Sequence, residues 1–151
     1  MIKFIAILLF SSLIVWGAAD CSQFSNDCEY YTCVAQSRHC TSKSYPINFG
    51  RKYCLRYNQS FQKFSSNGKR WIQDVRRCLI QKMESYDSEL TCHELKIRAF
   101  KDHIPCYIDH GYCELSNQDK IEIIKTVLPS LRHLRVLYSG AELSLACKYR
   151  K

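Results

Sequence analysis

The sequence predicts an all-α fold, a compact array of about five to six helices stapled by disulfides. Three observations lead to this prediction. Apolar and aromatic residues recur every three or four positions along most of the chain, and strand-like alternation is nowhere sustained. The ten cysteines are an even number. The five glycines and three prolines are too few for a loop-dominated disulfide fold or a β-sandwich with many turns.

The first 19 residues have the pattern of a secretory signal peptide. Lys3 supplies a positive charge, residues 4–16 form an apolar run, and small residues follow at 17–19. The run is too short for a helix that spans about 30 Å of hydrocarbon, although an N-terminal membrane anchor is the alternative interpretation. We therefore expect cleavage after Ala19, secretion without a membrane span, and a single domain over residues 20–151.

All the cysteines fall within that expected domain. In an oxidising compartment, an even number of cysteines favours complete pairing with no free thiol. The sequence has no CxxC pair and no Cys/His cluster at zinc-finger spacing, so no metal is expected. About 945 pairings are possible by the counting rule, and the residues alone do not choose among them.

Two amphipathic helices are predicted on either side of an Asn-Gly turn. The first covers residues 51–65 and carries an aromatic stripe made of Tyr53, Tyr57, Phe61 and Phe64. Asn67-Gly68 suits a left-handed helix end. The second helix runs from Lys69 to about Ser85 with an apolar stripe made of Ile72, Val75 and Leu79. We expect an antiparallel hairpin whose two stripes belong to the core.

Further helices are predicted in the C-terminal half. One apolar pattern, formed by Leu90, Leu95, Phe100 and Ile104, indicates a helix that ends at Pro105. Ser116 and Asp119 resemble a capping box before the segment KIEIIKTVLP, in which Pro129 breaks or kinks the helix. A Leu-rich helical pattern then resumes and is interrupted at Gly140.

No motif indicates catalysis. The segment HELKI begins at His93 like a metalloprotease helix, but Ile97 stands where the second histidine would be needed. The sequence has no GxSxG, no glycine-rich phosphate loop and no EF-hand calcium loop. The five histidines are dispersed, and we expect them at the surface: His39, His93, His103, His110 and His133. We therefore expect no catalytic residue and no cofactor.

The charge favours a binding surface. The chain carries 22 Lys and Arg against 14 Asp and Glu. Of these, only Lys3 lies in the signal peptide, so the mature net charge is about +7. Several basic residues of the hairpin are expected to point mostly towards solvent: Arg56, Lys63, Lys69, Arg70, Arg76 and Arg77. We predict that Arg70, Arg76 and Arg77 attract heparan-type glycans or an acidic receptor face, the alternative being a generic solubilising charge. Nucleic acid is excluded as a partner by export.

The order of the cysteines resembles that of a known family. CEYYTC is followed by another half-cystine, by the hairpin segment YCLRYNQSFQKFSSNGKRWIQDVRRC, and later by a helix that ends in TVLP. This order resembles the stanniocalcins, which are secreted, disulfide-rich helical glycoprotein hormones. The resemblance spans Cys21 to Cys147 and implies five bridges: Cys21–Cys33, Cys28–Cys54, Cys40–Cys92, Cys78–Cys106 and Cys113–Cys147.

The resemblance also implies a function. It implies a non-catalytic signalling protein, a regulator of calcium and phosphate balance, that acts through a cell-surface receptor or another extracellular protein. An extracellular metalloproteinase inhibitor is the alternative, because family members can block such an enzyme. A secreted phospholipase-like enzyme is the third hypothesis, but the pair Asp109-His110 near Cys113 lacks the calcium loop that it would need. A scaffold reused for an unrelated role is a further alternative.

Two features depart from the family. Stanniocalcins carry an additional, odd cysteine that joins two chains, whereas this chain has an even number and stops shortly after Cys147. We therefore expect a monomer or a non-covalent dimer. The family's glycosylation sequon lies between the third and fourth cysteines, where this chain has VAQSRH. A sequon does occur at Asn58-Gln59-Ser60, and we predict that Asn58 is glycosylated.

Overall fold

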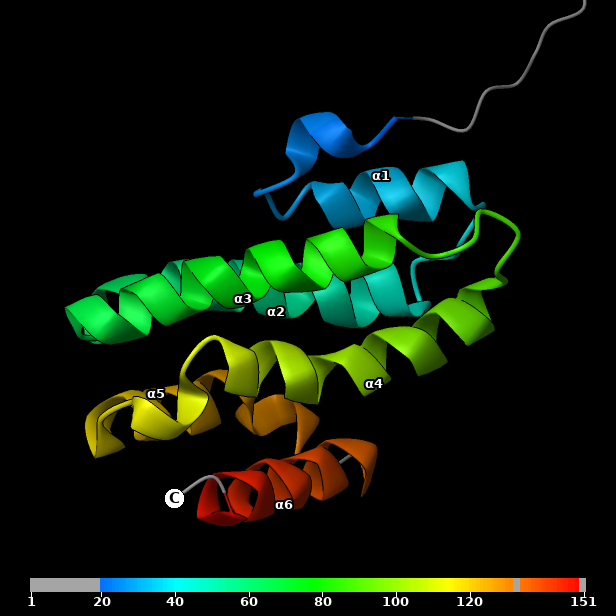
Figure 1. Cartoon of the computed structure of the whole chain (residues 1–151). Coiled ribbons are helices and arrows are strands. Elements are labelled where there is room, and N and C mark those ends of the chain that lie inside the picture. Colours follow the sequence, from blue (N-terminus) through cyan, green and yellow to red (C-terminus); the bar gives the residue numbers. More distant parts are fainter. Residues whose placement is uncertain (1–19, 132–133, 150–151) are drawn as a thin grey trace, which may run out of the picture.

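The computed structural model describes residues 20–131 and 134–149, and within these ranges the chain is all-α (Figure 1). Six α-helices lie in the described residues: α1 (Tyr30–Ser37), α2 (Lys52–Ser60), α3 (Ser66–Glu84), α4 (Cys92–Asp109), α5 (Asn117–Val127) and α6 (Leu134–Tyr149). A π-helical segment, Pro46–Arg51, leads directly into α2. The predicted fold class and number of helices are confirmed. The predicted signal peptide, residues 1–19, lies outside the described residues.

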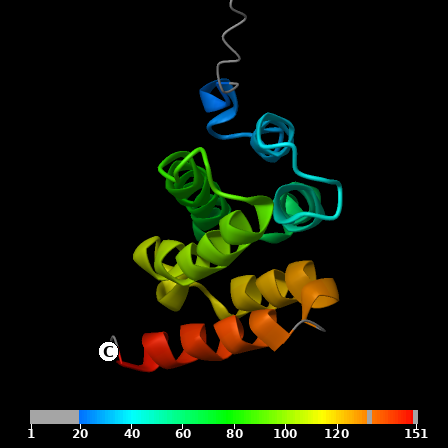
Figure 2. The same cartoon turned by 90° about the vertical axis from the view of Figure 1, so that its right-hand side faces the viewer.

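The helices stack around α4. In both views α4 lies between α3 and α6, while α1 lies at the opposite end of the molecule from α6 (Figures 1 and 2). Helix α2 contacts α5, and α1 packs against the π-helical segment. Among the described residues, no helix is long and apolar enough to cross a membrane.

The interior contains two apolar clusters, and α3 contributes to both. One cluster lies beneath α1, and its buried members include Tyr30, Tyr31, Val34, Ile80, Met83, Leu95 and Ala99. The other lies between the start of α3 and α5, and its buried members are Phe64, Trp71, Ile72, Val75, Leu115 and Ile123. Tyr57, Phe61 and Leu79 are partly buried against this second cluster. The two predicted stripes of the hairpin therefore do face the interior.

Five disulfides connect the elements, and every cysteine is paired within the chain. The pairs are Cys21–Cys33, Cys28–Cys54, Cys40–Cys92, Cys78–Cys106 and Cys113–Cys147. They coincide with the pairs that the resemblance implies. Helix α5 contains no cysteine, so it depends on packing and hydrogen bonds.

The turn of the hairpin differs from the prediction. Helix α2 ends at Ser60, and Asn67-Gly68 lies in the first turn of α3 instead of at a left-handed helix end. Ser65 caps α3, because its hydroxyl accepts a hydrogen bond from the Gly68 N–H at 3.1 Å. A Cβ atom on Gly68 would lie 2.5 Å from Asp119 Oδ1. The glycine is therefore required by a close approach between α3 and α5.

That close approach joins two helix N-termini through one carboxylate. Asp119 is fully buried and accepts hydrogen bonds from the Ser65 N–H at 2.8 Å and the Ser65 hydroxyl at 2.6 Å. It also accepts from the hydroxyl of Ser116, and Ser116 in turn caps α5 as predicted. Burial alone would raise the pKa of Asp119, but these hydrogen bonds outweigh it and hold the pKa below its usual value.

Two predicted helix interruptions are wrong. Helix α4 continues through Pro105 to Asp109, and α6 continues through Gly140. Pro105 is exposed, so the carbonyl that loses its helical partner at this proline can turn towards water. Gly140 is also exposed, and a glycine costs a helix only about 1 kcal/mol relative to alanine. Helix α5 does end at Val127, before the turn that contains Pro129, as predicted.

Candidate binding surfaces

The structure does not bring the three predicted polyanion-binding arginines together as free cations. Arg70 and Arg77 are exposed on α3, but Arg77 Nη1 lies 3.3 Å from Asp74 Oδ1. Arg76 is half-buried, and its guanidinium donates a hydrogen bond to Asn58 Oδ1 on α2. Burial lowers the pKa of Arg76 below its ordinary value. The prediction that Arg76 points to solvent is therefore wrong, because it follows the buried Ile72 by one helical turn.

Two other basic side chains of the hairpin are also less exposed to solvent than predicted. Arg56 is half-buried and donates from Nε to the carbonyl of Thr126 at 2.7 Å, which links α2 to the end of α5. Lys69 is half-buried and bonds to Gln62 Oε1 at 2.9 Å. Lys63 is exposed, as predicted. We use the name α3 arginine face for Arg70, Arg76 and Arg77 together.

The sequon asparagine borders the α3 arginine face. Asn58 is exposed on α2, and its Oδ1 accepts from Arg76. Its Nδ2 contacts Cys28 Sγ at 3.4 Å. A glycan attached to Nδ2 would replace that second contact and would stand beside Arg76. Glycosylation of Asn58 stays a prediction.

The histidines with described side chains differ in exposure. His39, His93 and His110 are exposed, as expected, and His133 lies outside the side chains that the structure describes. His103 differs from the prediction, because aromatic rings surround it and burial lowers its pKa. Its ring stacks on Phe100 at 5.6 Å, and its Nδ1 bonds to the Ala99 carbonyl at 2.6 Å. No group of three or more metal-ligating side chains occurs among the described residues.

A second basic surface was not predicted from the sequence. It lines an open groove of about 890 Å³ between the segment after Cys40, the π-helical segment, the first turns of α4 and the start of α6. Its charged or titratable lining residues are Lys43, Lys52, His93 and Lys96, and no carboxylate is among its described lining residues. We call this surface the Lys groove. All four of these side chains are exposed.

An aromatic cluster forms the floor of the Lys groove. The ring of Phe49 lies 4.7 Å from that of Phe100 and 4.6 Å from that of Tyr53, and Tyr45 meets Phe100 edge to face at 5.4 Å. Phe49 and Phe100 are partly exposed. Ile97 adds an apolar side chain to the lining, and 44% of its surface is exposed. The Lys groove thus combines cations with an apolar floor.

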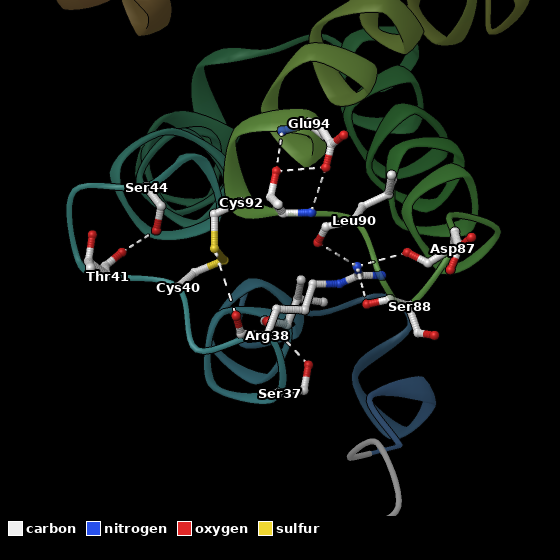
Figure 3. The surroundings of a disulfide bond; sticks show 12 residues. Ser37, Arg38, Cys40, Thr41, Ser44, Asp87, Ser88, Leu90, Cys92 and Glu94 are labelled. Atoms are coloured by element: carbon white, nitrogen blue, oxygen red, sulfur yellow. Dashed lines mark hydrogen bonds between the residues drawn. A yellow bond between two sulfur atoms is a disulfide. The ribbon is translucent and has the colours of Figure 1, made fainter.

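One wall of the Lys groove is fixed by a disulfide and by an arginine. The Cys40–Cys92 bridge ties the segment that carries Thr41 and Ser44 to the start of α4 (Figure 3). Beside this bridge, Arg38 Nη1 donates to three backbone carbonyls, those of Asp87 at 2.9 Å, Ser88 at 3.0 Å and Leu90 at 3.3 Å (Figure 3). The connection between α3 and α4 is thereby held in one conformation.

A capping box fixes the first turn of α4. The Thr91 hydroxyl accepts from the Glu94 N–H at 3.3 Å, and the Glu94 carboxylate accepts from the Thr91 N–H at 2.9 Å. The Thr91 hydroxyl also donates to the Glu94 carboxylate at 2.7 Å, and this hydrogen bond together with that from the Thr91 N–H lowers the pKa of Glu94. The backbone that carries His93 and Lys96 is therefore ordered by hydrogen bonds.

The Lys groove was missed because its cations come from separate parts of the sequence. Lys43 follows Cys40 by three residues, and Lys96 follows Cys92 by four. A run of charge along the sequence does not reveal such a cluster. The usable signal was the Cys40–Cys92 pair implied by the resemblance, which brings these two lysines to one region.

Comparisons with known proteins add no relative. No family model matches the chain, and neither a curated protein nor a solved structure matches it significantly. The resemblance to stanniocalcins therefore rests on the order of the cysteines and on the hairpin segment.

Proposed function

We propose that the chain is a secreted, non-catalytic, hormone-like signalling protein related to the stanniocalcins, which acts through an extracellular or cell-surface partner. The observation that supports this proposal best is the disulfide framework. Five bridges join all the helices except α5 in a chain of modest size, as is typical of proteins made in an oxidising compartment.

The surface is consistent with a binding role. The formal net charge is positive, and exposed cations gather at the Lys groove and on α3. Such positive charge attracts acidic receptor faces and sulfated glycans. At physiological ionic strength, salt screens this attraction beyond about 8 Å. We also propose a role in calcium and phosphate balance, which rests on the resemblance to the stanniocalcins alone.

The proposal is tested by binding to intact cells. Residues 20–151, folded with their disulfides and labelled with biotin, should bind in a saturable way, and excess unlabelled protein should compete. Reduced and alkylated protein is the matched control and should not bind. An affinity pull-down from the same cells then separates the two classes of function: a membrane receptor supports signalling, whereas capture and inhibition of a secreted metalloproteinase without cell binding would contradict it.

A further inference from the structure

We propose that the Lys groove binds an acidic segment of a protein partner, one that also inserts an aromatic or aliphatic side chain between the lysines. This inference goes beyond the proposed signalling role, because it assigns a site and a ligand chemistry that would serve a receptor-binding hormone and an inhibitor equally. It rests on the charge, the apolar floor and the fixed walls of the Lys groove.

Among the described residues, no carboxylate neutralises the lysines of the Lys groove. Lys43, Lys52 and Lys96 come from three different segments, and in the described part of the chain none of them forms an ion pair. Glu94 lies close enough to His93 to interact with it, but its carboxylate is bound to Thr91 and is not part of the groove lining. Several like charges around one concave surface raise the local concentration of an anionic ligand.

The lining also offers an apolar contact. Ile97 is largely exposed, and the partly exposed rings of Phe49 and Phe100 lie on the floor. Protein interfaces place apolar or aromatic anchors at the centre and charged groups at the rim, which is the arrangement in the Lys groove. A volume of about 890 Å³ is within the range of pockets that hold a ligand.

This combination favours a protein segment over two other anionic ligands. A sulfated glycan would neutralise the lysines but would place polar groups against Ile97, Phe49 and Phe100. A fatty acid would need an enclosed apolar cavity that buries most of its chain, whereas the Lys groove is open to solvent. An acidic peptide with one apolar side chain satisfies both the charged rim and the apolar floor.

The walls are ordered before any ligand arrives. The Cys40–Cys92 bridge, the Arg38 hydrogen bonds and the Thr91–Glu94 capping box fix the backbone that precedes Lys43 and the backbone that precedes Lys96. A site that is already ordered loses less conformational entropy on binding, which leaves more of the interaction free energy for affinity.

The test is selection from a displayed library of random dodecapeptides on folded residues 20–151. We expect the enriched peptides to carry Asp and Glu around an aromatic or aliphatic residue. The strongest peptide, synthesised with a fluorescent label, is then measured by fluorescence anisotropy. K43E/K52E/K96E should weaken its binding at least about tenfold, equivalent to about 1.4 kcal/mol. I97S, which removes only the apolar contact, should weaken it by a smaller factor.

A matched control changes as many charges elsewhere. K63E/R70E/R77E alters three exposed cations around α3 and should keep the peptide affinity within about twofold of the wild type at physiological salt, since separated exposed charges are largely screened. Circular dichroism and the thermal midpoint verify that both triple variants fold. The proposal is overturned if the selected peptides are not acidic, or if both triple variants lose the peptide equally. It is also overturned if K43E/K52E/K96E keeps the peptide but loses heparin, which would make the Lys groove a glycan site.

Discussion

The α3 arginine face and the Lys groove carry the same sign of charge but differ in what surrounds that charge. On α3, Arg77 pairs with Asp74 and Arg76 bonds to Asn58, so one exposed cation, Arg70, has no polar partner within the described residues. In the Lys groove, three lysines and a histidine line a concave surface, and none of its described lining residues carries a carboxylate. A count of basic residues therefore does not locate a binding site, whereas the neighbours of each cation do.

The difference has a structural cause. The α3 arginines lie on one helix of a hairpin, where neighbours three or four positions away and across the hairpin supply partners. The groove lysines come from three segments, which the Cys40–Cys92 bridge and the packing of Tyr45 and Phe49 on Phe100 bring together. Cations that are far apart in the sequence but close in the fold can gather on one surface where no acidic side chain is a neighbour along the helix.

The largest expected effect is the loss of stability when the Cys78–Cys106 bridge between α3 and α4 is removed. Replacing both Cys78 and Cys106 with Ala should lower the free energy of unfolding by about 2–5 kcal/mol, because the bridge ties α3 to α4 and Cys106 is fully buried. Urea denaturation measures the loss. The double variant C21A/C33A, which opens a shorter loop near the N-terminus, should lose less. An unchanged unfolding midpoint in C78A/C106A would show that this bridge does not contribute to the stability of the fold.

The next effect concerns the N-terminus of α3. Asp119→Ala should cost about 2–4 kcal/mol, because it leaves the N–H of Ser65 and the hydroxyls of Ser65 and Ser116 without the buried carboxylate that accepts from them. Asp119→Asn keeps one acceptor oxygen and should cost less. If the two variants are equally stable, the carboxylate does not link α3 to α5.

Asp119 also predicts a pH dependence. Its pKa is lowered in the folded protein, so its contribution to stability is present above the unfolded pKa, about 3.9, and is lost as the pH falls through the lower folded value. The free energy of unfolding of the wild type should therefore fall more steeply below pH 4 than that of Asp119→Asn. Parallel stability curves for the two proteins in acid would contradict this assignment.

The charge reversals on α3 should separate into two kinds. R70E/R77E changes exposed side chains and should lower the salt concentration at which the protein elutes from heparin, with unchanged helical circular dichroism. R76E places a carboxylate at a half-buried position and should lower the thermal midpoint as well. If R70E/R76E/R77E elutes at the salt concentration of the wild type, the α3 arginine face is not a glycan site.

The smallest expected effect is that of the Asn58 glycan. Protein secreted from eukaryotic cells should carry a glycan at Asn58, and a mass shift on enzymatic deglycosylation detects it. Because Asn58 contacts Arg76, removal of the glycan should raise the heparin elution salt slightly, and peptide binding at the Lys groove should stay unchanged. If deglycosylation changes peptide binding and leaves heparin elution unchanged, the glycan lies closer to the Lys groove than to α3.

The sequence predicted the parts of the fold that depend on local physics. Apolar periodicity indicated the helices from α2 to α6 but not α1, Ser116 indicated the start of α5, and Pro129 indicated its end. The error at the hairpin turn arose because a distant residue decides the outcome. Gly68 is needed by the approach of Asp119, which lies 51 positions along the chain, and no local signal reveals that contact.

For the candidate sites too, the features set by residues close in the sequence were predicted, and those set by distant residues were not. Helical periodicity placed Arg70 and Arg77 on the surface, but it did not show that Arg76 turns towards Asn58 on the neighbouring helix. To predict the Lys groove, the relative positions of three separate segments would have to be known. A disulfide pairing taken from the resemblance would have been the one route to it from sequence.

The most direct test of the Lys groove as the recognition surface is lysine footprinting of the protein while it is bound to intact cells. An amine-reactive label is applied to free and to cell-bound protein, and the modified lysines are located by mass spectrometry. The account predicts that Lys43, Lys52 and Lys96 become protected on binding, while the exposed Lys82 and Lys148 stay reactive. Protection of Lys63, which precedes α3, and of Lys69 within α3, with the groove lysines still reactive, would contradict it.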